Sequence, residues 1–415
     1  MNRLVIIGNG FDLAHGLKTS YKDFINWYWK YWGRKLLHGL SKVETDGLCT
    51  FKIREEKGAG IPNWAAAFQG WYYRRENVLT PWDYNEVVTL AKEDSTFCEF
   101  SMSPFLQEIC RNIESKGWVD IEDEYYELLK KYSLTNNNAD ELTDLNKQLN
   151  SLKNLLIKYL EDIDKHEVSI IKSIKEKIYA PIHLDDISVE GSSILKKYVD
   201  LWVSQNDTAV KDKINRYGLD ETDFNKVITY FREKYKVGTI RYTDVPWQYL
   251  LPDAVLLLSF NYTHTAQMYH NEDLGFINYI HGKIDDPQSI IFGYGDEMDE
   301  KYKELENKNN NQCLENIKSI NYLEKSNYRY MLSFIESQPY QICIMGHSCG
   351  NSDRTLLNTL FEHKNCISIK PYFYKKEDGT DNYLELIENI SRNFTDMKLM
   401  RDRVVNKSFC EPLTQ

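Results

Sequence analysis

The chain has 415 residues, of which 42% are hydrophobic and 27% charged, and its formal net charge is −11. This length and hydrophobic content support a sizeable core, whereas the acidic balance and the dispersed Lys and Arg argue against a general nucleic-acid binder. The apolar run before Asn9 is too short for a secretory signal, and no run approaches the 18 apolar residues of a membrane span. We therefore expect a cytoplasmic protein that does not contact a membrane.

The eight cysteines form no CxxC pair and show no metal-ligand spacing with the nine histidines. A zinc ribbon or a disulfide framework would need such spacing. We therefore expect reduced thiols and no metal site.

The first predicted element is a buried strand at residues 3–8, followed by a glycine turn and a helix over residues 13–32. The turn reads Gly8-Asn9-Gly10-Phe11-Asp12. Its glycines let the backbone approach a pyrophosphate, and the following helix offers N–H groups to the anion. Leu13 replaces the third glycine of the plain dinucleotide fingerprint, and Gly16 follows three residues later. The pattern predicts a phosphate cradle, although a Gly-x-Gly after a strand can equally be only a tight turn.

The middle of the chain predicts helices. Residues 48–115 are irregular, with short helices suggested by Trp64, Trp71, Trp82 and the stretch 65–68. From residue 118 to about 235, apolar residues recur at steps of three and four. The clearest example is Leu145, Leu149, Leu152, Leu156, Tyr159 and Ile163. This near-heptad spacing favours an intrachain helical hairpin over a coiled-coil partner surface.

Two further helix starts stand out in this region. Asp120 and Glu122 suit the dipole at the start of one helix, with Trp118 as a core anchor. The residues Asp220-Glu221-Thr222 fit the start of another helix.

Strand signals return after residue 254. The predicted strands are 254–260, 277–281, 289–293, 341–346 and 366–374. Helix-like or polar segments separate most of them, which favours parallel crossovers. Residues 296–328, rich in Glu, Lys and Asn, fit a solvated insertion better than a charged lid. We therefore predict an α/β core with a parallel sheet from residues 1–45 and 236–415, interrupted by a mainly helical insertion at 46–235.

Polar motifs follow several of these strands. They are Ser259-Phe260-Asn261, His281-Gly282 and Gly346-His347-Ser348. Loops that leave the carboxyl ends of parallel strands converge at the switch point of the sheet, so these motifs predict a ligand crevice. The Asn261 amide can hydrogen-bond ribose hydroxyls or a water, and the His281 imidazole can act as a general base near pH 7. Each residue alone can also serve only a turn or a strand end.

Residues 346–350 also match the Gly-x-Ser-x-Gly nucleophile elbow of serine hydrolases. The only histidine after Ser348 is His363, and a separation of 15 residues cannot span the strands that such a triad requires. The elbow is therefore disfavoured. Asp353 fits a helix cap or a ribose ligand, and we expect His264 and His270 to be structural or surface residues.

The chain resembles the bacterial abortive-infection AbiH family, which implies a role in defence against bacteriophage. The motifs that carry this resemblance are the segment 8–24, Trp118-x-Asp120-x-Glu122, Ser259-Phe260-Asn261-Tyr262-Thr263, Ile280-His281-Gly282, and Gly346-His347-Ser348-Cys349-Gly350-Asn351-Ser352-Asp353. They are spread over nearly the whole chain. The resemblance also keeps Glu122 as a secondary candidate.

A more distant resemblance, to sirtuins and sirtuin-like NADases, concerns chemistry. The glycines of residues 8–17 are similar to the loop that lies against the NAD diphosphate. Asn261 matches the Asn of a Thr-x-Asn motif, His281 matches a His-Gly motif, and residues 346–348 resemble a Gly-Thr-Ser loop. The four-cysteine zinc ribbon of sirtuins is absent, Thr263 replaces an Asp, and Asp12 replaces a small Ser, so a protein deacylase is disfavoured.

These resemblances imply a sirtuin-like Rossmann-type fold and NAD as substrate or ligand. They assign Asn261 and His281 as catalytic residues that hydrolyse the nicotinamide–ribose bond. The implied ligand-binding residues are Gly8, Asn9, Gly10, Phe11, Asp12, Gly16, Ser259, Gly346, Ser348 and Asp353. The alternatives are a non-catalytic nucleotide sensor that recruits a partner through its helical insertion, and a nuclease-type toxin. The phage trigger and a homo-oligomeric state stay open.

Overall fold

The core of the protein is a five-stranded parallel sheet with the order β6-β5-β1-β7-β8. The computed structural model describes residues 1–37, 43–53, 98–134, 139–204 and 208–414. The strands are β1 (Asn2–Ile7), β5 (Val255–Ser259), β6 (Gly275–Tyr279), β7 (Tyr340–Met345) and β8 (Cys366–Tyr372). The chain adds β5 and β6 on one side of β1, then β7 and β8 on the other, so the switch point lies between β1 and β7. The predicted parallel α/β sheet is confirmed.

Helices cover both faces of this sheet, which is why its strands are nearly continuous apolar runs. Leu4 and Ile6 pack toward one face, and Val5 and Ile7 toward the other. The first face is covered by α14 (Asn327–Ser337), α15 (Arg354–Phe361), α16 (Tyr383–Arg392) and α17 (Met397–Arg403). The second is covered by α1 (Asn9–Ala14) and α8 (Lys172–Tyr179).

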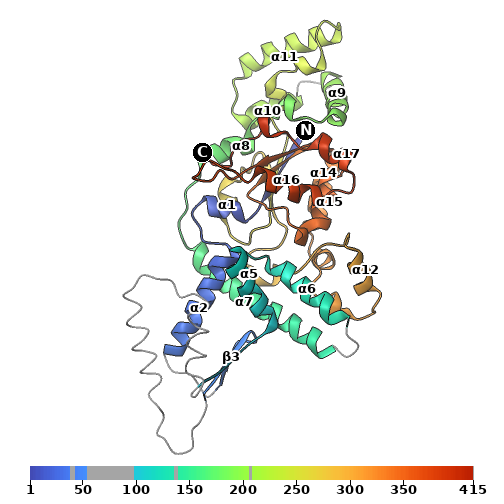
Figure 1. Cartoon of the computed structure of the whole chain (residues 1–415). Coiled ribbons are helices and arrows are strands. Elements are labelled where there is room, and N and C mark those ends of the chain that lie inside the picture. Colours follow the sequence, from blue (N-terminus) through green and yellow to red (C-terminus); the bar gives the residue numbers. More distant parts are fainter. Residues whose placement is uncertain (38–42, 54–97, 135–138, 205–207, 415) are drawn as a thin grey trace, which may run out of the picture.

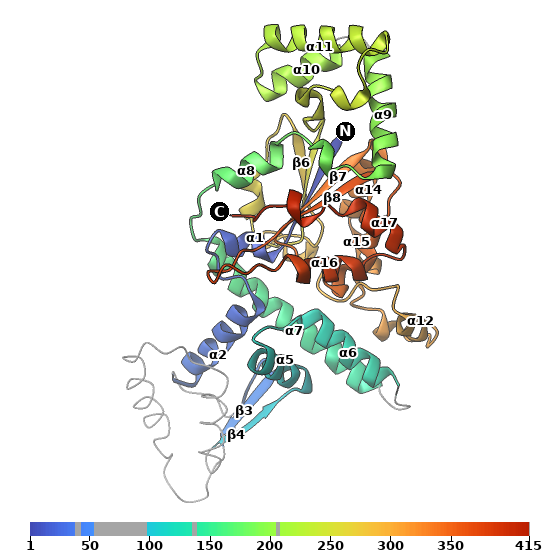
Figure 2. The same ribbon diagram turned by 45° about the horizontal axis from the view of Figure 1, so that its top comes forward.

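Two helical lobes lie at opposite ends of the strands (Figures 1 and 2). At the carboxyl ends, the lower lobe contains α2 (Tyr21–Leu37), α5 (Pro104–Lys116), α6 (Ile121–Ser133), α7 (Ala139–Asp164) and an antiparallel sheet of β2 (Val43–Thr45), β3 (Cys49–Ile53) and β4 (Cys98–Met102). At the amino ends, the upper lobe contains α9 (Val189–Ser204), α10 (Thr208–Tyr217) and α11 (Glu221–Lys236). The inserted helices thus form two separate cores, with α8 against the sheet between them.

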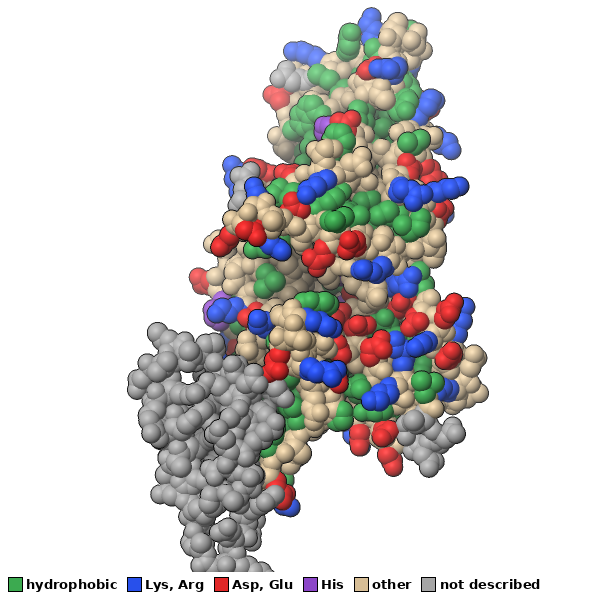
Figure 3. Space-filling view, in the orientation of Figure 1, with side chains coloured by type: hydrophobic (Ala, Val, Ile, Leu, Met, Phe, Trp, Pro, Cys, Tyr) green, Lys and Arg blue, Asp and Glu red, His purple; other side chains and the backbone are tan. Residues whose placement is uncertain are grey.

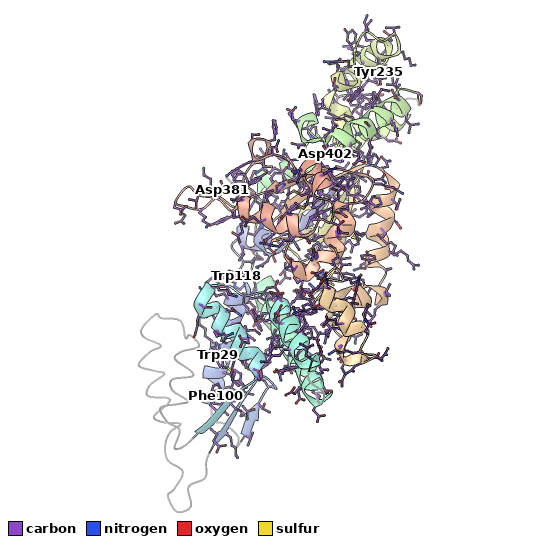
Figure 4. The ribbon with its side chains drawn as sticks, turned by 45° about the vertical axis from the view of Figure 1, so that its right-hand side comes forward. Trp29, Phe100, Trp118, Tyr235, Asp381 and Asp402 are labelled. Atoms are coloured by element: carbon purple, nitrogen blue, oxygen red, sulfur yellow. The ribbon has the colours of Figure 1, made fainter. Side chains whose placement is uncertain are left out.

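Side-chain contacts fasten each lobe to the sheet. The Asp402 carboxylate accepts hydrogen bonds from the backbone N–H groups of Val189 and Glu190 and so caps α9 (Figure 4). On the other side, the two ring nitrogens of His264 lie 2.6 Å from Asp164 at the end of α7 and 2.7 Å from Asp285. Burial lowers the pKa of His264, but hydrogen bonds to these two carboxylates raise it above the usual value. His264 is therefore a structural link, as expected.

Most of the predicted helices are confirmed. Asp120 caps α6 by accepting from the N–H groups of Glu122 and Asp123, and α11 begins at Glu221. The apolar stripe of α7 is buried within the lower lobe, against α6 and α2, so it belongs to an intrachain contact. Trp64, Trp71, Trp82 and the stretch 65–68 lie outside the described residues.

Two predicted elements are wrong. The helix expected over residues 13–32 is broken, because Gly16 has a φ of +80° that ends α1 before α2 begins. The strand expected at 289–293 does not form. The backbone N–H groups of this segment donate to carbonyls of different segments and not to those of one neighbouring strand. The N–H of Ile291, for example, donates to the His281 carbonyl.

The visible surface carries both signs of charge. Figure 3 shows Lys and Arg side chains interspersed with Asp and Glu over the described part of this face. Within the described ranges, every helix is too short or too polar to cross a membrane.

At the switch point, the loops after β1 and β7 pack backbone against backbone. The N–H of Gly10 donates to the Gly346 carbonyl over 2.7 Å. A Cβ on Gly8 would lie 2.5 Å from the His347 Cα, and one on Gly346 only 2.1 Å from the Phe11 nitrogen. Gly346 also has a φ of +76°. This close approach requires glycine whether or not a ligand binds.

Two glycines with similar φ allow the energetic cost of backbone strain to be distinguished from the cost of close packing. Gly379→Ala, where φ is +84° and the surrounding space is open, is expected to lower the free energy of unfolding by about 1–2 kcal/mol. Gly346→Ala adds overlap with the α1 backbone, so we expect a loss of about 3–5 kcal/mol. Denaturant unfolding measures both values. Equal losses would contradict the tight packing of the two loops.

Candidate functional site

The loops at the switch point hold a first polar group around the glycine turn. Asn261 donates from Nδ2 to the Gly8 carbonyl over 3.0 Å, and its own N–H reaches the Ser259 hydroxyl. Thr263 donates to a carboxylate oxygen of Asp12 over 2.6 Å. Asp12 is buried, and this burial raises its pKa from 3.8 to about 6, which hydrogen bonds from neighbouring side chains offset only in part.

The other residues predicted around the turn have varied surroundings. Phe11 is fully buried and packs edge-on against Tyr269. Asn9 accepts a hydrogen bond from Thr19 at the surface, and a Cβ on Gly16 would meet open space. Ser348 is exposed, and its backbone carbonyl accepts a hydrogen bond from Asn389. A phosphate-binding role for these residues therefore stays a prediction.

A second group, which we name the acid–base cluster, consists of Asp120, Glu122, His281, Lys318, His347 and Asp353. His281 is only 3% exposed, and its Nε2 lies 3.3 Å from Oδ1 of Asp353 and 3.0 Å from the Tyr322 hydroxyl. An ionised carboxylate can only accept hydrogen bonds. The ring proton of His281 therefore lies on Nε2, and Nδ1 is the atom that can accept a proton.

His347 approaches the same carboxylate from the other side. Its Nδ1 accepts the backbone N–H of Cys349 over 2.9 Å, so the proton of the neutral ring lies on Nε2, which is 3.4 Å from Oδ2 of Asp353. The Phe260 ring packs edge-on against both imidazoles, with centroid distances of 5.0 Å to His281 and 4.2 Å to His347. Asp353 thus orients two imidazole rings that also share an aromatic neighbour.

Lys318 supplies the positive charge of the cluster. Its Nζ lies 2.8 Å from Asp353 and 2.8 Å from Glu122, and its side chain is 1% exposed. Glu122 comes from the first turn of α6 and also accepts the N–H of Gly293 over 3.1 Å. The lower lobe therefore contributes directly to a site at the carboxyl ends of the strands.

The carboxyl groups of the cluster differ in charge. Burial raises the pKa of Glu122 to about 8, against the opposing effect of Lys318. Burial also acts on Asp353, but Lys318 and His281 hold the pKa of that carboxyl well below its usual range. Burial and Lys318 lower the pKa of His281. The pKa of Glu122 is thus raised while the pKa values of Asp353 and His281 are lowered, and such separated pKa values are typical of acid–base sites.

The predicted catalytic residues fall into the two groups. Asn261 belongs to the glycine turn, and His281 to the acid–base cluster with Asp353. Sequence reasoning missed Lys318, because a lysine in a charged segment looks solvated. Trp118 was expected in the core but is 62% exposed, since Val119 is buried in its place (Figure 4). Among the described residues, no three His, Cys, Asp or Glu side chains converge as metal ligands would.

One comparison with known proteins gives a match. A family model described as bacteriophage abortive infection AbiH matches residues 4–374. This range includes the parallel sheet apart from the first two residues of β1, both helical lobes and the whole acid–base cluster. No curated protein matches the chain, and no solved structure does.

The burial of Asp12 gives a pH-dependent prediction. Because its folded pKa is raised, the unfolded chain loses this proton first, and stability falls as the pH rises from about 4 to 6. We expect Asp12→Asn to raise the free energy of unfolding at pH 7 by up to about 3 kcal/mol, at about 1.36 kcal/mol per pKa unit. At pH 4 the variant and the wild type should be nearly equal.

Denaturant unfolding at the two pH values is the measurement, with Asp273→Asn on the surface as the control. A variant that is less stable than the wild type at pH 7 would show that the Asp12 carboxylate is well solvated or well paired.

Proposed function

Because the chain belongs to the AbiH family of bacteriophage abortive-infection proteins, we propose that it acts in phage defence by hydrolysing NAD at the nicotinamide–ribose bond. The observation that carries the proposal is the buried pair of His281 and Asp353, which lies beside the switch point of a Rossmann-type sheet. The distant resemblance to sirtuin-like NADases adds the choice of substrate. Loss of NAD would stop the host and the phage together.

The proposed reaction needs little chemistry from the protein. The bond between ribose C1′ and the pyridinium nitrogen breaks, and its electron pair leaves with neutral nicotinamide. A water oxygen then bonds to C1′ and loses one proton, which gives ADP-ribose. The transition state resembles an oxocarbenium ion, so the protein must hold the ribose, place the water and accept that proton.

His281 is proposed as the group that accepts the proton. Burial and the nearby Lys318 lower its pKa, so the neutral imidazole is favoured and can accept a proton. The Asp353 carboxylate fixes the tautomer and stabilises the imidazolium that forms. The amide of Asn261 is proposed to bind the ribose hydroxyls or the water, with the glycine turn near the diphosphate.

The covering of His281 suggests that the described state is latent. Phe260 packs against one edge of the ring, and the Tyr322 ring lies parallel to it with a hydroxyl 3.0 Å from Nε2. One of these aromatic side chains must move before a ribose can reach the base. An infection-dependent trigger that moves it would keep the host's NAD intact until the phage arrives.

The same burial favours a second candidate function, a nucleotide sensor without turnover. His281 would then be only a structural part of the core beneath the bound nucleotide. In that case protection against phage would survive the loss of the imidazole.

Substitution of the two proposed catalytic residues tests the assignment. We expect His281→Ala and Asn261→Ala each to slow NAD hydrolysis by about 10²–10⁴-fold, because the proton acceptor or the ribose contact is lost. ADP-ribose release by the purified protein and NAD content in infected cells are the readouts.

His183→Ala is the matched control, because this histidine has an exposed side chain. It should keep the wild-type rate. NAD consumption that is undiminished in both folded site variants would refute the hydrolase. Full phage protection by His281→Ala without any NAD loss would instead support the sensor.

A further inference from the structure

Lys318 occupies a position that the proposed chemistry leaves unexplained. It belongs to α13 (Lys318–Asn321), in the charged segment 296–328, which also contains α12 (Glu300–Glu306). Sequence analysis predicts a solvated insertion there. Lys318 is instead almost fully buried, and the same short helix is followed by Tyr322, which contacts His281. The segment thus contributes two side chains to the acid–base cluster.

We propose that Lys318 is a positioning residue: its ammonium group holds the Asp353 carboxylate in contact with His281 and ties this pair to α6 of the lower lobe. The inference rests on the proposed function, since it assigns Lys318 a role in the same site. Lys318 itself touches no reacting atom and acts through Asp353.

The geometry of one oxygen atom carries the inference. Oδ1 of Asp353 lies 2.8 Å from the Lys318 ammonium and 3.3 Å from the His281 imidazole. Any change in the ion pair therefore changes the partner of the imidazole directly. A lysine that only filled space would not share an acceptor with the proposed base.

The charges of the cluster explain why an ammonium is needed there. Glu122 and Asp353 bring two buried carboxyl groups to the site with Asp120 nearby, and among the described residues Lys318 is the one permanent cation that contacts Glu122 and Asp353. Burial favours the neutral form of each carboxyl group. Without the ammonium, the Asp353 carboxylate would depend on a protonated His281 as its charge partner, so the imidazolium would be favoured.

The groups around His281 come from several segments. Asp353 follows β7, Lys318 and Tyr322 lie in segment 296–328, and His347 lies in the loop after β7. Phe260 adds an apolar edge. Of these groups, Lys318 disfavours a positive imidazole and Asp353 favours it, so the position of Lys318 sets the proton affinity of the base.

Histidine titration in the full-length protein tests the inference without requiring turnover. The protein is labelled with ¹³C at the histidine rings, and the His281 signal is assigned by its loss in His281→Gln. We expect Lys318→Met to raise the pKa of His281 by about 1–3 units, because a nearby positive charge is removed. Lys318→Arg should return the pKa toward the wild-type value, since the charge is kept.

Lys325→Met is the matched control, because Lys325 lies in the same segment but is exposed. It should leave the His281 titration unchanged. If Lys318→Met does not fold, Lys318→Gln keeps a hydrogen-bond donor without the charge and should give the same upward shift. If neither variant folds, titration of the wild type tests the inference, because the pKa of His281 must lie below the usual imidazole value of about 6.5.

The outcomes separate this inference from the proposed function. An unchanged pKa of His281 in a folded Lys318→Met or Lys318→Gln variant overturns the positioning role, as does a wild-type His281 whose pKa is at or above the usual imidazole value of about 6.5. A raised pKa, with the acid limb of NAD hydrolysis displaced equally, supports both proposals. A raised pKa in a protein that never hydrolyses NAD supports the positioning role and refutes the hydrolase.

Discussion

The contact between Lys318 and Asp353 is the interaction on which the rest of the site depends. Two ionised groups buried together lose much hydration, and the loss is tolerable only when each finds enough partners. Asp353 meets this condition through Lys318, His281 and His347, and Lys318 meets it through Glu122. The same requirement fixes where the loops after β6 and β7 and the start of α6 must lie. A buried charge thus organises segments that are far apart in sequence.

The topology of the sheet explains how those segments meet. Parallel strands end at one edge, and the switch between β1 and β7 opens that edge to both halves of the sheet. The lower lobe closes the edge, with Glu122 reaching into it from α6. The upper lobe packs on the opposite edge and takes no part in the cluster. Helices inserted into one stretch of the chain therefore have different roles: one lobe completes the site and the other covers the amino ends of the strands.

The sequence predicted those parts of the fold that depend on local patterns. Apolar runs predicted four of the later strands: β5, β7 and β8 are buried on both faces and need no alternation, whereas the edge strand β6 is partly exposed over most of its length. The candidate site was predictable only in part. His281 and Asp353 could be identified because they follow strands, where polar residues indicate a ligand crevice. Lys318 could not be predicted as part of the site, because hydropathy indicates that a lysine is solvated and only tertiary contacts reveal its partners. Gly16 shows the same limit: its positive φ breaks a helix that periodicity alone continues.

A crystal structure with a non-hydrolysable carba-NAD tests where the proposed substrate binds. We expect the diphosphate beside the turn at Gly8 and Gly10 and the nicotinamide ribose beside His281 and Asp353, with Phe260 or Tyr322 moved away. Density for the analogue at another surface, or a fully occupied complex in which both aromatic side chains still cover His281, would contradict it.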